Sequence, residues 1–138
     1  FGHSMGGHCA LPLALRHPPL FASVSALAPI AAPSQVPWGQ KAFAGYLGPD
    51  RRRWAEHDAV ELLKERRLPG TLLVDQGTAD KFLERELRPE LLEAACREAG
   101  QPLVLRRRAG YDHGYYFVAS FIEGHLRHHA AALTEPSV

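Results

Sequence analysis

The chain has 138 residues, of which 46% are hydrophobic and 22% are charged, and its formal net charge is +1. This composition is typical of about one globular domain. Proteins that bind nucleic acid or anionic membranes carry a strong basic excess, so we expect neither partner here. The longest apolar stretch, residues 21–33, is interrupted by Ser23, Ser25 and Pro29 and is shorter than the ~20 residues that span a bilayer. We therefore expect no membrane anchor.

The two cysteines, Cys9 and Cys96, form no Cys-x-x-Cys motif, and the N-terminus has no signal-peptide pattern. We therefore expect no disulfide framework, no structural zinc and a cytoplasmic location. The chain opens at Phe1 without an initiating methionine, directly before a motif that bears on catalysis. This opening indicates a piece of a longer protein.

Helices dominate the first half of the chain. The predicted elements are a buried helix at 4–16, a buried strand at 23–28, a helix at 40–47 that Gly48 ends, and two short helices capped by Asp50 and Asp58. Pro12 is expected to kink or break the first helix. Asp58 and Glu61 have the spacing of a capping box, which gives Asp58 a structural role.

Strands and helices alternate in the second half. The predicted elements are a strand at 71–75, a polar loop at 76–80, two helices that meet at Arg88-Pro89, a strand at 102–107, a helix at 115–133 and a polar tail at 134–138. This alternation indicates parallel crossovers and an α/β sheet of about three strands. Three strands would leave residues 23–28 at an open edge, so we expect a neighbouring strand that ends at Phe1.

The segment Gly2-His3-Ser4-Met5-Gly6 matches Gly-x-Ser-x-Gly, the nucleophile elbow. In this motif a strand turns sharply into a helix, and glycines permit backbone approaches that larger residues would block. The turn exposes Ser4 Oγ and directs the Met5 amide toward a developing oxyanion. Three fixed positions recur by chance in glycine-rich loops, but here a predicted helix follows directly and Gly7 allows close packing.

A serine nucleophile needs a base within hydrogen-bond reach, and that base needs a carboxylate to fix its tautomer. In α/β hydrolases the chain order is nucleophile, acid, histidine. Asp80 and His113 follow Ser4 in this order, and each lies in a loop after a predicted strand. We therefore take Ser4, Asp80 and His113 as a candidate triad.

Two other acidic residues compete for the role of triad acid. Asp75 ends a predicted strand and could turn its carboxylate into the sheet, whereas Asp80 stands in the return loop, from which it can reach the histidine. Asp112 directly precedes His113 and is expected to bond nearby backbone amides. We favour Asp80.

The remaining histidines have no clear place in this chemistry. His3 and His8 flank the elbow but are too close to Ser4 in sequence to reach back as a base. His125, His128 and His129 have a spacing that could bind a metal, but no acidic residue accompanies them. We expect these three on the solvated face of the last helix.

Several further residues allow a functional or a structural interpretation. Residues 51–53 and 106–108 are arginine triplets that could bind an anionic ligand, although we favour solvated positions. Trp38 lies in a proline-rich loop and could line an acyl or leaving-group pocket, or be buried without touching a ligand. Cys96 fits an inert core position, and Cys9 lies one turn into the first helix, where either a lowered pKa or packing explains it.

Five groups of residues, taken in this order, closely resemble the S-formylglutathione hydrolase family, also called the esterase D family. They are 2–8, 23–30, 37–48, 75–83 and 110–117. The resemblance extends from residue 1 to about residue 130. It implies an α/β-hydrolase fold, no metal or organic cofactor, and hydrolysis of the small-molecule thioester S-formylglutathione to glutathione and formate. Members of the family also act on simple esters and commonly form homodimers.

By position, the resemblance gives Ser4 the role of nucleophile, Asp80 that of triad acid and His113 that of general base. It makes the Met5 amide one half of the oxyanion hole. Cys9 and Pro12 depart from the family pattern, in which we expect glycine and a helix former, and both lie in the helix that supports Ser4.

The resemblance also implies that residues 1–133 form the C-terminal half of one α/β-hydrolase domain. The family's N-terminal half supplies the first strands and the loop with the second oxyanion donor. Loss of one such donor lowers rates ~10²–10³-fold, so we expect the chain alone to be a weak enzyme. A broad carboxylesterase or acyltransferase of the same fold, and an inactive truncated remnant, are the alternatives.

Overall fold

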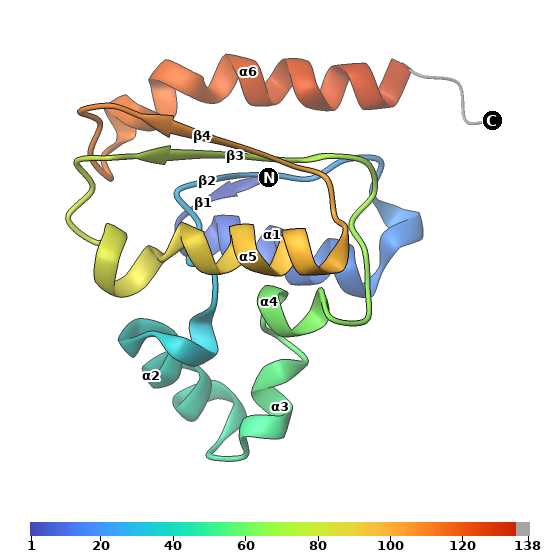
Figure 1. The fold of residues 1–138 in the computed structure, drawn as a ribbon, viewed down its shortest axis with the longest axis vertical. Helices are drawn as coiled ribbons and strands as arrows, with labels where there is room; N and C mark the ends of the chain where they lie inside the picture. Colours follow the sequence, from blue (N-terminus) through green and yellow to red (C-terminus); the bar gives the residue numbers. More distant parts are fainter. Residues whose placement is uncertain (135–138) are drawn as a thin grey trace.

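A parallel four-stranded sheet with helices on both faces forms the centre of the computed structural model, which describes residues 1–134 (Figure 1). The strands, in their order across the sheet, are β1 (Gly2–His3), β2 (Ser25–Leu27), β3 (Leu72–Gly77) and β4 (Leu103–Arg108). The helix α6 (Tyr115–Thr134) lies over one face, and α1 (Met5–Arg16) and α5 (Pro89–Ala99) lie over the other.

The remaining elements connect α1 to β2, β2 to β3, and β3 to α5. They are the 3₁₀ turns η1 (Pro18–Leu20) and η2 (Pro33–Gln35), the helices α2 (Pro37–Leu47), α3 (Arg51–Ala55) and α4 (Ala59–Leu62), and the π-helical turn η3 (Leu83–Leu87). In Figure 1, α2 and α3 extend away from the sheet beyond α1 and α5.

The α/β class and the order of the elements are confirmed, but the number of strands was too low by one. The fourth strand is the neighbour expected beside residues 23–28, and it occupies Gly2–His3 instead of ending at Phe1. The other three strands begin one or two residues later than predicted, and two of them also end later. The parallel ladder between β3 and β4 accounts for this, since it continues to the pair Gly77 and Arg108.

The predicted break at Pro12 is not found, since α1 runs without interruption from Met5 to Arg16. Proline within a helix removes one hydrogen bond and costs about 3 kcal/mol. Leu11, Ala14 and Leu15 are fully buried against the sheet. Burial of this apolar face stabilises the helix enough to offset the proline.

Two apolar cores lie on opposite faces of the sheet. The larger one joins α1, α4 and α5 to the sheet, and Leu72 and Val74 of β3 belong to it. The smaller one is centred on Phe117 of α6 and Leu27 of β2, close to the carboxyl ends of the strands. Side chains alternate between the faces of a strand, so Asp75 of β3 points away from the larger core.

Asp75 lies under α6 in a polar cluster that the sequence did not predict. Its fully buried carboxylate accepts hydrogen bonds from Arg106 at 2.6 and 3.0 Å, from Arg108 at 2.7 Å and from His125 at 2.9 Å. Burial alone would raise the pKa of Asp75, but the hydrogen bonds from these three side chains lower it to about 2.

The expectation of a solvated histidine face on the last helix is wrong. His125 is fully buried against Asp75, and His128 donates to the Val24 carbonyl at 3.2 Å. His129 lies between two serine hydroxyls, 2.7 Å from Ser23 and 2.8 Å from Ser25. The histidine side of α6 therefore faces β2 and β3, where the polar residues of the sheet supply partners.

The N-caps of α3 and α4 agree in part with those predicted from the sequence. Asp50 accepts from the Arg52 amide and Asp58 from the Val60 amide, as expected for N-caps. The capping box is incomplete, because Glu61 pairs with Lys64 and the Asp58 amide bonds the Ala55 carbonyl. The second carboxylate oxygen of Asp58 instead accepts from the Ser34 amide at 2.9 Å, which ties α4 to η2.

The turn from β1 into α1 has the strained backbone that an elbow requires. Ser4 adopts φ 58° and ψ −117°, and its amide bonds the Leu27 carbonyl at 2.9 Å. A Cβ on Gly2 would lie 2.4 Å from the carbonyl of Gly6, and one on Gly7 would lie 2.9 Å from the carbonyl of Gly2. A Cβ on Gly6 would meet nothing within 4 Å. The turn therefore depends on Gly2 and Gly7 more than on Gly6.

The predicted tail at 134–138 begins one residue too early, because Thr134 is the last residue of α6, and 135–138 lie outside the described residues. Within residues 1–134, none of the helices combines the length and the apolar character needed to cross a membrane.

Glycine at position 2 is open to a direct test. Gly2→Ala is expected to lower the free energy of unfolding by about 2–3 kcal/mol, because the new methyl group collides with the first turn of α1. Gly6→Ala is the matched control and should change stability by no more than ~1 kcal/mol, since the space is open and alanine favours helix. Urea denaturation measures both, and equal stabilities of the two variants would contradict the assignment.

The Asp75 cluster predicts a loss of stability in acid. The folded pKa of about 2 lies below the ordinary 3.8, so Asp75 stabilises the fold above pH ~4 and this contribution disappears as the pH falls through about 2. The shift corresponds to about 2 kcal/mol. Asp75→Asn cannot show this titration. The stability difference between the parent and this variant should therefore shrink by that amount between pH ~5 and ~2 in urea denaturation, and a constant difference would refute the prediction.

Candidate active site

Three side chains from distant parts of the sequence meet above the carboxyl ends of the strands. Ser4 Oγ lies 2.9 Å from His113 Nε2, and His113 Nδ1 lies 2.6 Å from Asp80 Oδ2. Ser4 and His113, whose positions in the sequence differ by 109, come together because β1, β3 and β4 end at one edge of a parallel sheet. The structure thus brings together the three residues that the sequence placed in the candidate triad.

The partners of His113 determine its tautomer. Burial would raise the pKa of Asp80, but hydrogen bonds from His113 and from the Phe82 amide lower it below the ordinary value, so Asp80 is a carboxylate near neutral pH. A carboxylate only accepts, so His113 Nδ1 carries the proton and Nε2 is free to accept one. The Ser4 hydroxyl donates to Nε2, which can remove its proton during attack on a carbonyl carbon.

Backbone hydrogen bonds hold the loops of Asp80 and His113 against each other. Beyond the last pair of β3 and β4, the Thr78 amide bonds the Arg108 carbonyl and the Ala79 amide bonds the Tyr111 carbonyl, both at 3.0 Å. A Cβ on Gly77 would lie 2.3 Å from the Tyr111 carbonyl oxygen, so glycine permits this approach. The two loops form one rigid support for the acid and the base.

The competing carboxylates lie elsewhere. Asp75 is bound by arginines and His125 under α6, and Asp112 accepts from the Gly114 amide at 2.8 Å. Asp80 lies in the return loop after β3, as expected; Thr78 and Ala79 of this loop are exposed, whereas the side chain of Asp80 is buried. The carboxylate is thus shielded from water.

Three neighbours of the triad were missed by the sequence analysis. His3 packs on His113 with ring centroids 4.6 Å apart, and Phe82 meets the same ring edge-on at 5.2 Å. Burial and the proximity of His113 lower the pKa of His3, so His3 is neutral. Gln76 donates to Asp80 Oδ2 at 3.3 Å. All three lie within motifs already noted, but only the fold shows what they touch.

The Met5 amide lies at the N-terminus of α1, and its role as an oxyanion donor stays a prediction. Met5 is the first residue of α1, and the first amides of a helix have no partner within it. The positive end of the helix dipole also favours a negative charge at this point. A carbonyl oxygen beside Ser4 could therefore accept a hydrogen bond from Met5.

Trp38 lies at the rim of this site. Its ring is 40% exposed, so the alternative in which it is simply buried is wrong. Its centroid lies 4.5 Å from that of Phe82, which in turn contacts His113. The Trp38 amide donates to the buried Glu86 at 2.9 Å, which fixes the start of α2 over η3. A contact between Trp38 and substrate stays a prediction.

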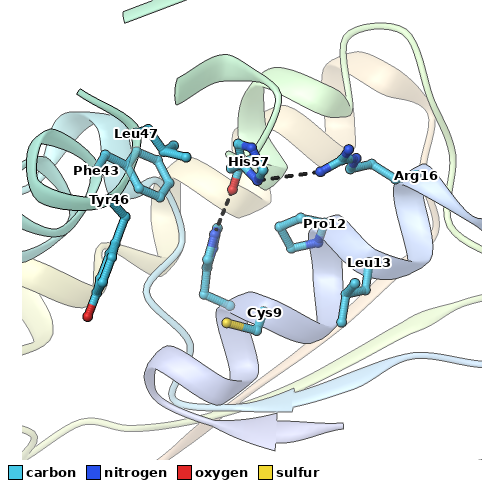
Figure 2. Close-up of a pocket in the computed structure, with 9 residues that line it drawn as sticks. Cys9, Pro12, Leu13, Arg16, Phe43, Tyr46, Leu47 and His57 are labelled. Carbon is cyan, nitrogen blue, oxygen red and sulfur yellow. Dashed lines mark hydrogen bonds between the residues drawn. The ribbon is translucent and has the colours of Figure 1, made fainter. Parts of the chain in front are cut away.

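A separate apolar groove of about 340 Å³ lies between α1 and α2 (Figure 2). The residues that line it are His8, Cys9, Pro12, Leu13, Arg16, Phe43, Tyr46, Leu47 and His57. His8 of α1 is held by two carbonyls, because its ring nitrogens lie 2.9 Å from the His57 carbonyl and 3.1 Å from the Ile30 carbonyl. None of the triad residues lines this groove.

The arginines of the second triplet and the buried Cys96 contact other residues of the fold. Arg106 and Arg108 bind Asp75, and Arg107 pairs with Glu93 of α5, so the second triplet is not simply solvated. Cys96 is buried in the larger core, and burial raises the pKa of its thiol to about 11, which agrees with an inert position. Cys9 is exposed. Within residues 1–134, no three His, Cys, Asp or Glu side chains are grouped so as to hold a metal ion.

The chain is similar to proteins named S-formylglutathione hydrolase. It is 53% identical over 135 residues to that of Rattus norvegicus, covering 96% of this chain and 48% of the relative. It is 51% identical over 133 residues to that of Arabidopsis thaliana, covering 96% and 47%. The chain therefore spans about half the length of the curated relatives that it matches.

Comparison with solved structures agrees. The structure of an S-formylglutathione hydrolase from Agrobacterium tumefaciens superposes with a TM-score of 0.93 at 48% identity, over 96% of this chain and 48% of that one. The expected α/β-hydrolase fold is thereby confirmed. The sequence profile of the esterase family, described as "Putative esterase", matches residues 1–128 of the chain. This match covers most of the chain, which therefore belongs to that esterase family.

Proposed function

We propose that this chain carries the catalytic triad of a serine thioesterase that hydrolyses S-formylglutathione to glutathione and formate. The observation that carries the proposal is the continuous hydrogen-bond path from Ser4 through His113 to Asp80, at 2.9 and 2.6 Å. The substrate comes from the names of the similar proteins, which are about half identical to this chain over the aligned residues.

In the first half of the reaction, Ser4 Oγ attacks the formyl carbon while His113 Nε2 takes the hydroxyl proton. The carbonyl oxygen becomes an oxyanion that the Met5 amide stabilises. The carbon–sulfur bond then breaks, and the leaving glutathione sulfur receives the proton from His113. Asp80 stabilises the transient imidazolium without accepting its proton.

In the second half, water attacks the formyl ester on Ser4. His113 takes a proton from this water and returns it to Ser4 Oγ as the ester bond breaks, so formate leaves and the triad is restored. In this path residues of the chain supply the nucleophile and carry out every proton transfer, and the path requires no metal or organic cofactor.

We also propose that residues 1–133 are the C-terminal half of the hydrolase domain. The nucleophile elbow at residue 4 and the coverage of about half of each relative support this boundary. The other half would then supply the second oxyanion donor. A homodimer and a cytoplasmic location stay predictions that rest on the family resemblance and on the sequence features given above.

A broad carboxylesterase of the same fold is the second candidate, because the family model is that of esterases in general. The exposed Trp38 and the half-buried Phe82 beside it would suit the aryl group of a simple ester as well as a thioester.

Removal of the nucleophile tests the triad in the complete hydrolase domain, which contains the proposed N-terminal half as well as this chain. Ser4→Ala should lower kcat for S-formylglutathione by about 10⁴–10⁶-fold, because no other group can form the acyl-enzyme. Asp80→Asn should lower it by about 10⁴-fold, because it favours the wrong His113 tautomer. Asp112→Asn is the matched control beside the base and should keep nearly the parent rate. Thiol release followed with a chromogenic reagent gives these rates, and unchanged turnover of Ser4→Ala rejects the triad.

Substrate preference separates the two candidates. We expect kcat/KM of the complete domain to be larger for S-formylglutathione than for p-nitrophenyl acetate, since recognition of the glutathione part lowers the barrier for the thioester alone. The two constants are compared on one preparation, with Ser4→Ala as the blank. A clear preference for the aryl ester would replace the thioesterase with the carboxylesterase.

A further inference from the structure

Gln76 of β3 lies next to the candidate triad, yet the mechanism above does not use it. Its side chain is 1% exposed, and its Nε2 lies 3.3 Å from Asp80 Oδ2 and 3.1 Å from the Gly77 carbonyl oxygen. Both partners are acceptors, which fixes the orientation of the amide with its nitrogen toward Asp80.

Asp80 is held by three donors within the described residues. Oδ1 accepts from the Phe82 amide at 2.9 Å, and Oδ2 accepts from His113 at 2.6 Å and from Gln76. The first donor belongs to the backbone and the second to the proposed base. Gln76 is therefore the side chain outside the triad that directs this carboxylate.

The burial of Gln76 costs free energy that an apolar side chain would not. Its Oε1 is buried and has no hydrogen-bond partner within residues 1–134. An unsatisfied buried acceptor is destabilising, so a side chain that only filled space would be better as methionine or leucine. The side-chain amide of Gln76 forms its hydrogen bonds through Nε2, to Asp80 Oδ2 and to the carbonyl of the adjacent Gly77. Apart from the bond to Gly77, the bond to Asp80 is what compensates for the burial.

We propose that Gln76 is a positioning residue that holds the Asp80 carboxylate ionised and pointed at His113. This inference rests on the proposed function, since positioning matters only if Asp80 serves His113 as the triad acid. Asp75, the preceding residue, points to the opposite face of the sheet under α6. The Asp75-Gln76 pair thus joins one residue that stabilises the fold to one that supports the candidate site.

Titration of Asp80 tests the proposal on the 138-residue chain without an activity assay. The charged or titratable groups near Asp80 are His113 from the loop before α6 and His3 from β1, and both remain in every variant. Gln76→Met keeps the length of the side chain but removes the donor. The pKa of Asp80, followed through its ¹³C carboxyl resonance, should move upward toward the ordinary 3.8.

A second variant covers the case in which Gln76→Met fails to fold. Gln76→Glu keeps the shape and places a second carboxyl beside Asp80, so the two share a proton and the pKa of Asp80 should rise further than in Gln76→Met. Gln101→Met is the matched control. Gln101 is also buried, at 4% exposure, but it bonds Leu68, Gly70 and Pro102 far from Asp80. Its loss should leave the Asp80 titration unchanged.

Kinetics of the complete domain give the second readout. In Gln76→Met, kcat should fall about tenfold, which is the factor expected for one hydrogen bond to a charged group, while KM changes little. An Asp80 titration equal to that of Gln101→Met would overturn the proposal. An inactive parent with the predicted Asp80 shift would instead overturn the proposed function, and with it the positioning role, while the shift would still show that Gln76 lowers the pKa of Asp80.

Discussion

The hydrogen bond between Asp80 and His113, at 2.6 Å, is the interaction on which the chemistry of this chain depends. It fixes the proton of His113 on Nδ1 and leaves Nε2 to accept from Ser4 at 2.9 Å. The bond can form because the sheet is parallel and each contributing strand ends at the same edge. Without this alignment, Ser4 would be an ordinary alcohol with a pKa far above neutrality.

The sheet separates two kinds of polar interaction. Above the carboxyl ends of the strands lie the exposed elbow, the half-buried ring of His113 and the shielded carboxylate of Asp80. Under α6 lies Asp75 with two arginines and His125, and this cluster is anchored within the fold. Breaking a buried ion pair by removing one partner costs about 3–5 kcal/mol, so Asp75 acts on stability, whereas Asp80 acts on the candidate site.

The sequence predicted those parts of the site whose backbone conformation is determined by a few adjacent residues. The elbow at residues 2–6 is set by a few adjacent residues, and its strained Ser4 follows from that short pattern. The order of nucleophile, acid and base along the chain selected Asp80 and His113 as candidates, but could not show on which face of β3 the competing carboxylate of Asp75 lies. The position of the Asp75 carboxylate is determined by its ion pairs with Arg106 and Arg108, which lie 31 and 33 residues away in the sequence.

Features that depend on tertiary packing could not be predicted in the same way. The residues of β2 and β3 that contact α6 determine which side of this helix is buried. The sequence of α6 alone therefore predicts solvent-exposed positions for His125 and His129, whereas Asp75 and Ser25 bind them in the fold. The strand β1 has two residues, too few for any periodicity, so the sequence predicted a neighbour of β2 but not its bounds, which the pairing with β2 shows. The contact of Gln76 with Asp80 likewise joins the end of a strand to a loop whose path the sequence does not specify.

Activation of Ser4 by His113 is tested most directly by covalent labelling. The 138-residue chain is treated with a fluorophosphonate, which reacts with serine hydroxyls that a neighbouring base activates, and the adduct is mapped by mass spectrometry of peptides. The hydrogen-bond path from Asp80 predicts one adduct, on Ser4, that is absent from His113→Ala. An unlabelled chain, or an equal adduct on Ser4 in the His113→Ala variant, would contradict it.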